Sequence, residues 1–317
     1  MTTLRIRFLL LAAASASFGS ASFATLLGAQ PPAARDTTPP LTSSPLPTGR
    51  VTYRTLTETN LELEQLAARH PDRGRRFALP HKTVLGQTVW ALEVARNVTT
   101  PDGRPSFLMT GLHHSREWPT VDLTMEFVHD ILMNDGKDAR ITELLDNVRF
   151  LVVPVVNPDG YELSRTLLNE QKRKSCRITA GAPATFAECA NPRNRNAGVD
   201  LNRNYGAFWG GIGANLGAME GSYRGPAPFS EPEIQNMRDL MNAHQVVVAL
   251  SNHTPDAKVL RAPSSPDEPV PADAAPYDAL GKAVGGDLKW DAGPWTEIYY
   301  AASGTMVDRL ADKPTAH

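Results

Sequence analysis

The sequence predicts an α/β fold in which a mixed, mostly parallel sheet carries helices on both faces. From about Val51 onward, segments of helical and strand composition alternate, and this alternation favours a sheet between two helical layers. The segment VRFLVVPVV at 148–156 is nearly all apolar and β-branched, as is typical of a strand buried on both faces. Polar clusters follow three of the predicted strands, which indicates one shared site.

The first fifty residues are expected to lie outside this fold. Residues 1–30 contain two arginines, an apolar stretch and then small residues, the pattern of a cleaved signal peptide. The alternative is an uncleaved anchor, but the apolar stretch is shorter than the about 20 residues that a membrane span needs. Residues 31–50 are rich in Pro, Thr and Ser and predict an extended linker. We therefore expect a secreted protein whose single domain covers 51–317.

The expected elements follow from apolar periodicity and from capping residues. A helix within 56–71 has Thr57 or Thr59 as its N-cap and ends at Pro71. A later helix opens with SEPE, in which Ser230 caps and Glu233 reaches back. The remaining elements are expected as strands over 88–96, 104–112 and 246–253, and as helices over 120–133, 230–244, 277–284 and 304–310.

Composition excludes some partners and gives the cysteines a role. A formal net charge of −2 offers no electrostatic reason to bind nucleic acid or an anionic membrane, so we expect neither as a partner. Cys176 and Cys189 are the only cysteines of the chain, and in an exported protein they predict a disulfide. As zinc ligands they would need two further partners at short spacing.

The polar clusters HHSRE, NPDGY and SNHT each come directly after a predicted strand. In open α/β sheets, ligands bind beyond the carboxyl ends of the strands. His114 and Glu117 are three residues apart and can supply two ligands of a tetrahedral Zn²⁺, with His253 as the third and water in an open fourth position. His113 is an alternative to His114, because neighbouring side chains of an extended strand point to opposite faces. Spacing leaves this choice open.

Two further segments offer groups that bind anions. Asn202 and Arg203 in VDLNRNY provide an amide and a guanidinium fork, a combination suited to a carboxylate. Arg173 lies in the basic run EQKRKSCR, and most such runs are simply exposed to solvent.

Taken together, HSREW, NPDGY, VDLNRNY, FSEPE and a late histidine occur in an order that resembles the zinc carboxypeptidases of the carboxypeptidase A type. The resemblance runs from about Thr52 to Asp308. It implies one Zn²⁺ as cofactor, and it leaves His113 outside the ligand set. Residue by residue, it implies zinc ligands His114, Glu117 and His253, a substrate contact by Arg116, binding of the terminal carboxylate by Asn202 and Arg203, oxyanion stabilisation by Arg173 as the catalytic residue, and a mobile loop whose tyrosine is Tyr300, with Tyr299 one register away.

The implied function is zinc-dependent hydrolysis of the C-terminal peptide bond of peptides or proteins by a monomer. Val307 falls where the family sets side-chain preference and indicates an apolar or aromatic C-terminal residue. The family also has a general-base glutamate on a strand after the tyrosine loop. The nine residues after Asp308, RLADKPTAH, match neither this strand nor the closing helix, so we expect the domain to be incomplete there. The alternative function is a catalytically inactive protein that binds zinc and peptide C-termini.

Overall fold

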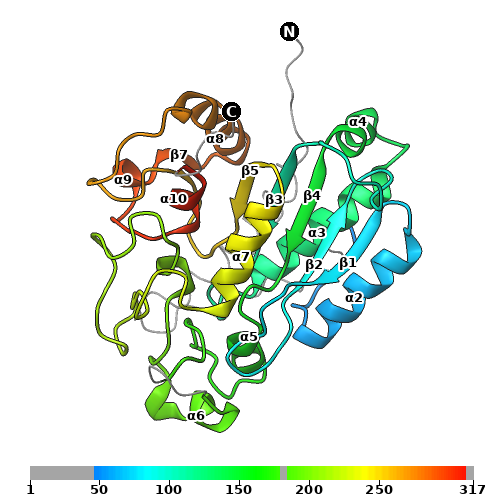
Figure 1. Cartoon of the computed structure of the whole chain (residues 1–317). Helices are drawn as coiled ribbons and strands as arrows, with labels where there is room; N and C mark the ends of the chain where they lie inside the picture. Colours follow the sequence, from blue (N-terminus) through cyan, green and yellow to red (C-terminus); the bar gives the residue numbers. More distant parts are fainter. Residues whose placement is uncertain (1–45, 179–183, 312–317) are drawn as a thin grey trace, which may run out of the picture.

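The computed structural model describes residues 46–178 and 184–311 (Figure 1). The predicted signal peptide and residues 31–45 of the predicted linker lie outside these ranges. The last linker residues are described, and Thr48 donates its N–H and its hydroxyl to the Glu126 carboxylate at 2.9 and 2.6 Å. Within the described ranges, no helix has both the length and the apolar character that crossing a membrane would require.

A five-stranded sheet forms the centre of the molecule, and its strands lie in the order β1-β2-β4-β3-β5. β3 pairs in parallel with both β4 and β5, whereas β2 is antiparallel to β1 and β4. The α/β class is confirmed, and the sheet is mixed rather than mostly parallel. The strands are β1 (Gly74–Ala78), β2 (Trp90–Val94), β3 (Ser106–Thr110), β4 (Arg149–Val153) and β5 (Val246–Ser251).

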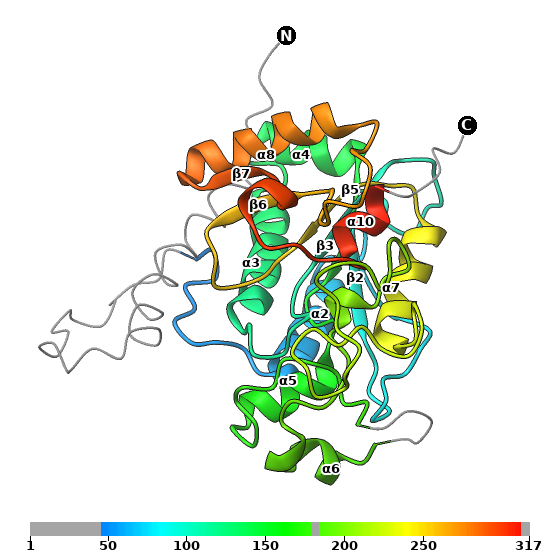
Figure 2. The same ribbon diagram turned by 90° about the vertical axis from the view of Figure 1, so that its left-hand side faces the viewer.

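Helices cover both faces of this sheet, as predicted. One apolar core joins α2, α3 and α4 to one face, and a second core joins α7 and α10 to the other. Figures 1 and 2 show α3 and α7 on opposite sides of the strands. These helices are α2 (Leu56–Arg69), α3 (Pro119–Asn134), α4 (Ala139–Asn147), α7 (Pro232–Ala243) and α10 (Met306–Ala311).

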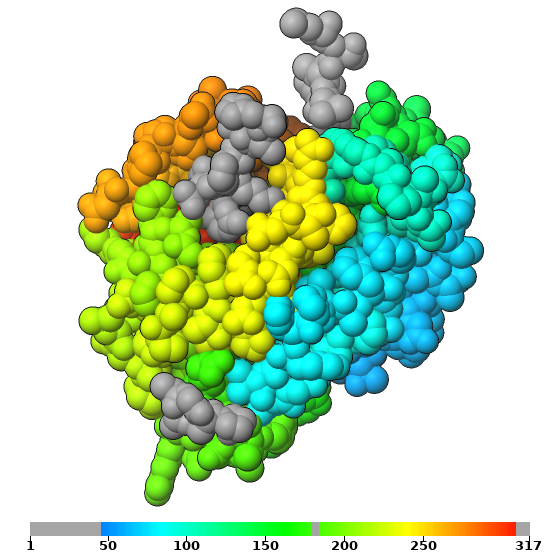
Figure 3. Space-filling view, in the orientation of Figure 1, coloured from blue at the N-terminus to red at the C-terminus, as the bar shows by residue number. Residues whose placement is uncertain are grey.

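The remaining elements extend the domain beyond one end of the sheet and beyond its β5 edge. After β4 come α5 (Pro158–Arg165) and then the short helices α6 (Phe186–Ala190), η1 (Pro192–Asn194) and η2 (Leu201–Arg203). Beyond β5, β6 (Lys258–Arg261) pairs in parallel with β7 (Asp291–Pro294), and α8 (Ala274–Leu288) and α9 (Trp295–Ile298) complete this part. In Figure 3, the yellow surface that includes α7 lies between the blue and cyan N-terminal segments on one side and yellow-green and orange segments on the other.

Several local predictions need correction. The N-cap of α2 is Thr55, not Thr57 or Thr59, and it forms a capping box with Glu58. No side chain caps α7: its first turn is opened by Pro232, while the Ser230 hydroxyl is donated to Glu231. The run VVVAL of β5 has the composition of a buried strand, yet in the described residues β5 pairs only with β3, and Val247 is 48% exposed. The predicted Cys176–Cys189 disulfide is present.

A buried pair of carboxyl groups joins the segment after β6 to α10. The Ser264 N–H lies 3.2 Å from both Glu268 Oε2 and Asp308 Oδ1. Ser264 Oγ and Thr305 Oγ1 donate to Asp308 Oδ2 at 2.6 and 2.7 Å. Burial, reinforced by the charge of Asp308, raises the pKa of Glu268 to about 8. The folded protein therefore keeps the Glu268 proton at neutral pH.

This proton makes folding stability dependent on pH. In the unfolded chain Glu268 ionises near its ordinary pKa of 4.5, whereas in the folded protein it ionises near 8. The unfolded state therefore binds fewer protons between these values, and this group lowers stability as pH rises through that range. We expect Glu268→Gln, which cannot titrate, to remove that part of the pH dependence. Urea unfolding of both proteins at several pH values checks this, and parallel curves would contradict it.

Candidate metal centre

The turn between β3 and α3 is shaped by close backbone approach. A side chain at Gly111 would come within 2.7 Å of the carbonyl oxygen of Thr120, and Leu112 adopts a φ of 56°. Thr120 Oγ1 accepts the Leu112 N–H at 2.9 Å and donates to the Glu117 carbonyl at 2.7 Å. The Glu117 N–H bonds the His114 carbonyl at 3.0 Å. These bonds fix the direction of the side chains at 114 and 117.

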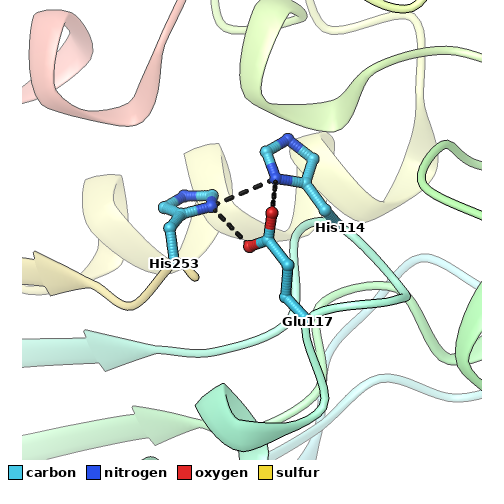
Figure 4. A group of neighbouring side chains, drawn as sticks. All are labelled: His114, Glu117 and His253. Carbon is cyan, nitrogen blue, oxygen red and sulfur yellow. Dashed lines mark hydrogen bonds and ion pairs between the residues drawn. The ribbon is translucent and has the colours of Figure 1, made fainter. Parts of the chain in front are cut away.

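Three side chains converge where this turn meets the end of β5 (Figure 4). Glu117 Oε1 lies 2.8 Å from His114 Nδ1, and Glu117 Oε2 lies 2.9 Å from His253 Nδ1. The two Nδ1 atoms are 3.1 Å apart, and the candidate ligand atoms of the three residues all lie within 4.8 Å of one another. Two imidazoles and one carboxylate form a ligand set that is typical of catalytic zinc.

Asp200 determines how His114 can bind a metal. His114 Nε2 lies 3.0 Å from Asp200 Oδ1, and a carboxylate only accepts hydrogen bonds, so Nε2 carries the ring proton of neutral His114. The lone pair of His114 Nδ1 then points toward Glu117 and His253. The lone pairs of the two Nδ1 atoms and of the Glu117 carboxylate repel one another at these distances unless a cation lies between them. The donor set therefore fits Zn²⁺, and the carboxylate–histidine pair is the usual support of a zinc ligand.

The electrostatic environment keeps both carboxylates ionised. Burial opposes the charge of Glu117, but the adjacent His114 and His253 hold its pKa below the usual range. Burial likewise opposes the charge of Asp200, while Arg173 and His114 hold its pKa well below normal. Arg173 Nη2 donates to Asp200 Oδ2 at 2.9 Å, and its Nη1 lies 3.7 Å from Glu117 Oε1. Arg173 thus faces the three-residue centre and is not a solvated surface residue.

The predicted carboxylate-binding residues lie beside the same centre. Asn202 Nδ2 lies 3.4 Å from His253 Nε2, and its Oδ1 accepts the Met306 N–H at 3.0 Å. Arg203 is buried, and donates to the carbonyls of Gly213 at 3.1 Å and of Asn202 at 2.7 Å. The Arg203 guanidinium lies 6.0 Å from the Tyr300 ring centroid.

The two tyrosines and Arg116 occupy different surroundings. Tyr300 is 53% exposed, and its carbonyl accepts the indole N–H of Trp295 at 2.7 Å. Tyr299 donates its hydroxyl to Asp256, and its ring centroid lies 4.3 Å from that of Tyr300. Arg116 is exposed on the turn that carries Glu117.

The structure separates the two adjacent histidines. His113 is fully buried beside Tyr205 and Ser251, and it does not belong to the group of three. The cluster NPDGY supports the site from behind: Asn157 caps α5 and lies 3.4 Å from the His113 carbonyl. Asp159 instead accepts hydrogen bonds from Thr83 and Leu85.

Sequence reasoning missed two residues of this centre. Asp200 stands in VDLNRNY beside the predicted Asn202 and Arg203, and the rule that ligand histidines bond a carboxylate could have found it. Ser251, two residues before His253, carries no comparable signal, because serines that cap and serines that support ligands look alike in sequence.

Comparisons with known proteins agree with this geometry. The family described as zinc carboxypeptidase matches residues 60–312. Carboxypeptidase B of Bos taurus is 31% identical over 258 residues, which are 79% of this chain and 58% of that protein. Carboxypeptidase A2 of Rattus norvegicus is 30% identical over 268 residues, which are 82% of this chain and 60% of that protein. The chain thus spans about three-fifths of the length of these curated relatives.

Solved structures show the same fold. Carboxypeptidase A from Helicoverpa armigera superimposes with a TM-score of 0.71 at 24% identity, covering 82% of this chain and 61% of that one. Thrombin activatable fibrinolysis inhibitor gives a TM-score of 0.70 at 23% identity, covering 82% and 65%. Fold, ligand geometry and sequence match thus agree: this chain belongs to the zinc carboxypeptidase family.

Proposed function

We propose that this chain acts as a secreted zinc metallocarboxypeptidase that removes the C-terminal residue of peptides or proteins. The observation that carries the proposal is the convergence of His114, Glu117 and His253 beside a buried arginine, Arg203. The domain expected over 51–317 would carry this activity. The predicted signal peptide supports export, and the protein acts as a monomer.

The residues of the centre have separate tasks in this proposal. His114, Glu117 and His253 hold one Zn²⁺, which supplies Lewis-acid chemistry by polarising a carbonyl group and acidifying water. Arg173 is held by Asp200 within 4 Å of a ligand oxygen, so its cationic group is positioned to stabilise an oxyanion that develops there.

Substrate binding falls to residues beside the metal centre. Arg203 and Asn202 bind the terminal carboxylate and so restrict cleavage to the chain end. Tyr300 covers the substrate, and Arg116 contacts the substrate chain. Val307, half-buried at the start of α10, supports an apolar or aromatic terminal side chain.

A second candidate is a protein that binds zinc and peptide C-termini without hydrolysing them. Within residues 46–178 and 184–311, the carboxylates in contact with the three ligands are Glu117 itself and Asp200. Both Asp200 oxygens are occupied, one by His114 and the Asn202 N–H and the other by Arg173. Asp200 is therefore a poor general base, and this observation favours the binding protein.

The first test is turnover of a blocked dipeptide with C-terminal Phe. We expect the zinc-loaded chain to release Phe, and a chelator or Glu117→Ala to abolish the release. The same dipeptide with a C-terminal amide is the matched control, since it lacks the carboxylate that Arg203 binds. Stoichiometric zinc with peptide retention but no release would select the binding protein, and absence of zinc binding would contradict both candidates.

Arg203 should determine the preference for a free carboxylate. Arg203→Met keeps the aliphatic stem and removes charge-assisted hydrogen bonds, each worth about 1.5–3 kcal/mol. We expect roughly 10–100-fold weaker binding of an acylated Phe acid and unchanged weak binding of its amide. Calorimetric titration measures both. Arg261→Met, which breaks the ion pair with Asp278 on α8, is the control, and equal losses in both variants would contradict the assignment.

Asp200 should determine zinc affinity through His114. Asp200→Asn preserves the size of the side chain but allows the amide to donate, which releases the His114 tautomer. Loss of such a support typically costs about 10–100-fold in metal affinity. Competition with a chromophoric chelator measures the zinc affinity. Asp278→Asn is the matched control, and unchanged affinity in Asp200→Asn would show that Asp200 does not orient the ligand.

A further inference from the structure

Half-buried Ser251 and buried His113 and Tyr205 form a hydrogen-bonded series that begins at Nε2 of His253, the ring nitrogen that does not face Glu117. His253 Nε2 lies 3.2 Å from Ser251 Oγ, which lies 3.3 Å from His113 Nδ1. His113 Nε2 lies 2.7 Å from Tyr205 Oη. His113 and Tyr205 are both 0% exposed, so these two side chains depend on each other and on Ser251 for hydrogen bonds.

His253 needs a hydrogen-bond acceptor at Nε2 if its Nδ1 binds a metal. His253 Nδ1 faces Glu117 Oε2 and His114 Nδ1 at 2.9 and 3.1 Å, so a metal bound there uses the Nδ1 lone pair. The ring proton then resides on Nε2 and needs an acceptor. Ser251 Oγ is the acceptor within reach at 3.2 Å.

The hydrogen bonds from Ser251 to His113 and from His113 to Tyr205 have donors and acceptors that are consistent with this acceptor role of Ser251. Once Ser251 Oγ accepts from His253, its own hydrogen is free to be donated to His113 Nδ1. The proton of His113 then lies on Nε2, which donates to Tyr205 Oη. In this arrangement each of the three contacts, His253 to Ser251, Ser251 to His113 and His113 to Tyr205, pairs one donor with one acceptor.

Asn202 is a competing neighbour of the same nitrogen. Its Oδ1 is committed to the Met306 N–H at 3.0 Å, so Nδ2, a donor, faces His253 Nε2 at 3.4 Å. An amide donor opposes a proton on Nε2 and favours the tautomer that protonates Nδ1. An acceptor at Ser251 is therefore needed to select the tautomer that binds metal.

We propose that Ser251 and His113 are positioning residues that fix the tautomer and ring orientation of His253 for metal binding. Ser251 acts directly on the ring, and His113 acts by directing the Ser251 hydroxyl. The inference rests on the proposed zinc function and assigns a task to the histidine that the ligand set leaves out.

The test measures Zn²⁺ affinity of the purified chain by chelator competition. We expect Ser251→Ala and His113→Leu each to weaken it about 10–100-fold. Both changes interrupt the same series of hydrogen bonds. The double variant should therefore lose no more Zn²⁺ affinity than the single variant that binds zinc more weakly. His113→Asn, whose amide oxygen can take the place of Nδ1 as acceptor, should retain most of the affinity. His81→Leu, which removes a histidine paired with Asp239 near α7, is the control.

Further readouts separate positioning from folding and from the proposed function. Metal-free thermal unfolding reports folding, and a structural role alone would lower the Tm while leaving the affinity of the folded protein unchanged. In nitrogen-15 NMR of the zinc-loaded chain, the His253 Nε2 proton should exchange slowly in the original protein and quickly in Ser251→Ala.

If the original chain binds zinc and Ser251→Ala binds it equally well, the inference is wrong and the zinc function stands. If the original chain binds no zinc, both are wrong. If His113→Leu does not fold, Ser251→Ala and His113→Asn decide the question.

Discussion

Parallel pairing of β3 with its two neighbours is the constraint on which the site depends. Because β4, β3 and β5 run in the same direction, their carboxyl ends meet at one edge, and the segments that follow them meet there too. The turn after β3 delivers His114 and Glu117, and the end of β5 delivers His253. Reversing β3 or β5 would place the candidate ligands that follow it at the opposite edge of the sheet. Gly111 permits the close backbone approach that lets the chain turn so soon after β3.

The ligands are held by polar groups from distant parts of the chain. His114 depends on Asp200, which lies 86 residues away in sequence, and Asp200 in turn holds Arg173. Such buried polar groups stabilise a site only when each has a partner, since an unpaired buried charge costs several kcal/mol. The metal centre, the cationic group of Arg173 and the support of His114 are therefore one interdependent network, and loss of one member leaves the others unsatisfied.

The sequence predicts most of the elements and the three residues that converge at the candidate metal centre, because periodicity and strand-end clusters are local signals. Spacing alone leaves open whether His113 or His114 faces the site, since that depends on the turn set by Gly111 and Leu112; only the family resemblance selects His114. The antiparallel strand β2 and the edge position of β5 could not be read from composition, because pairing partners are chosen in three dimensions. Thr55 rather than Thr57 caps α2, because the helix begins at Leu56, two residues before the start that a cap at Thr57 would give.

Asn202, one of the proposed carboxylate-binding residues, also connects the candidate metal centre to the backbone at the start of α10. Asn202 contacts His253 through Nδ2 and holds the Met306 N–H through Oδ1. The carbonyl of Gly304, two residues earlier, accepts the Tyr205 N–H at 3.0 Å. Tyr205 bonds His113, whose ring centroid lies 5.6 Å from that of His253. The segment that follows Tyr300 is therefore connected to His253 by two routes, through Asn202 and through Tyr205, His113 and Ser251. If a peptide binds as proposed and displaces this segment, the displacement would reach His253 through the side chain of Asn202.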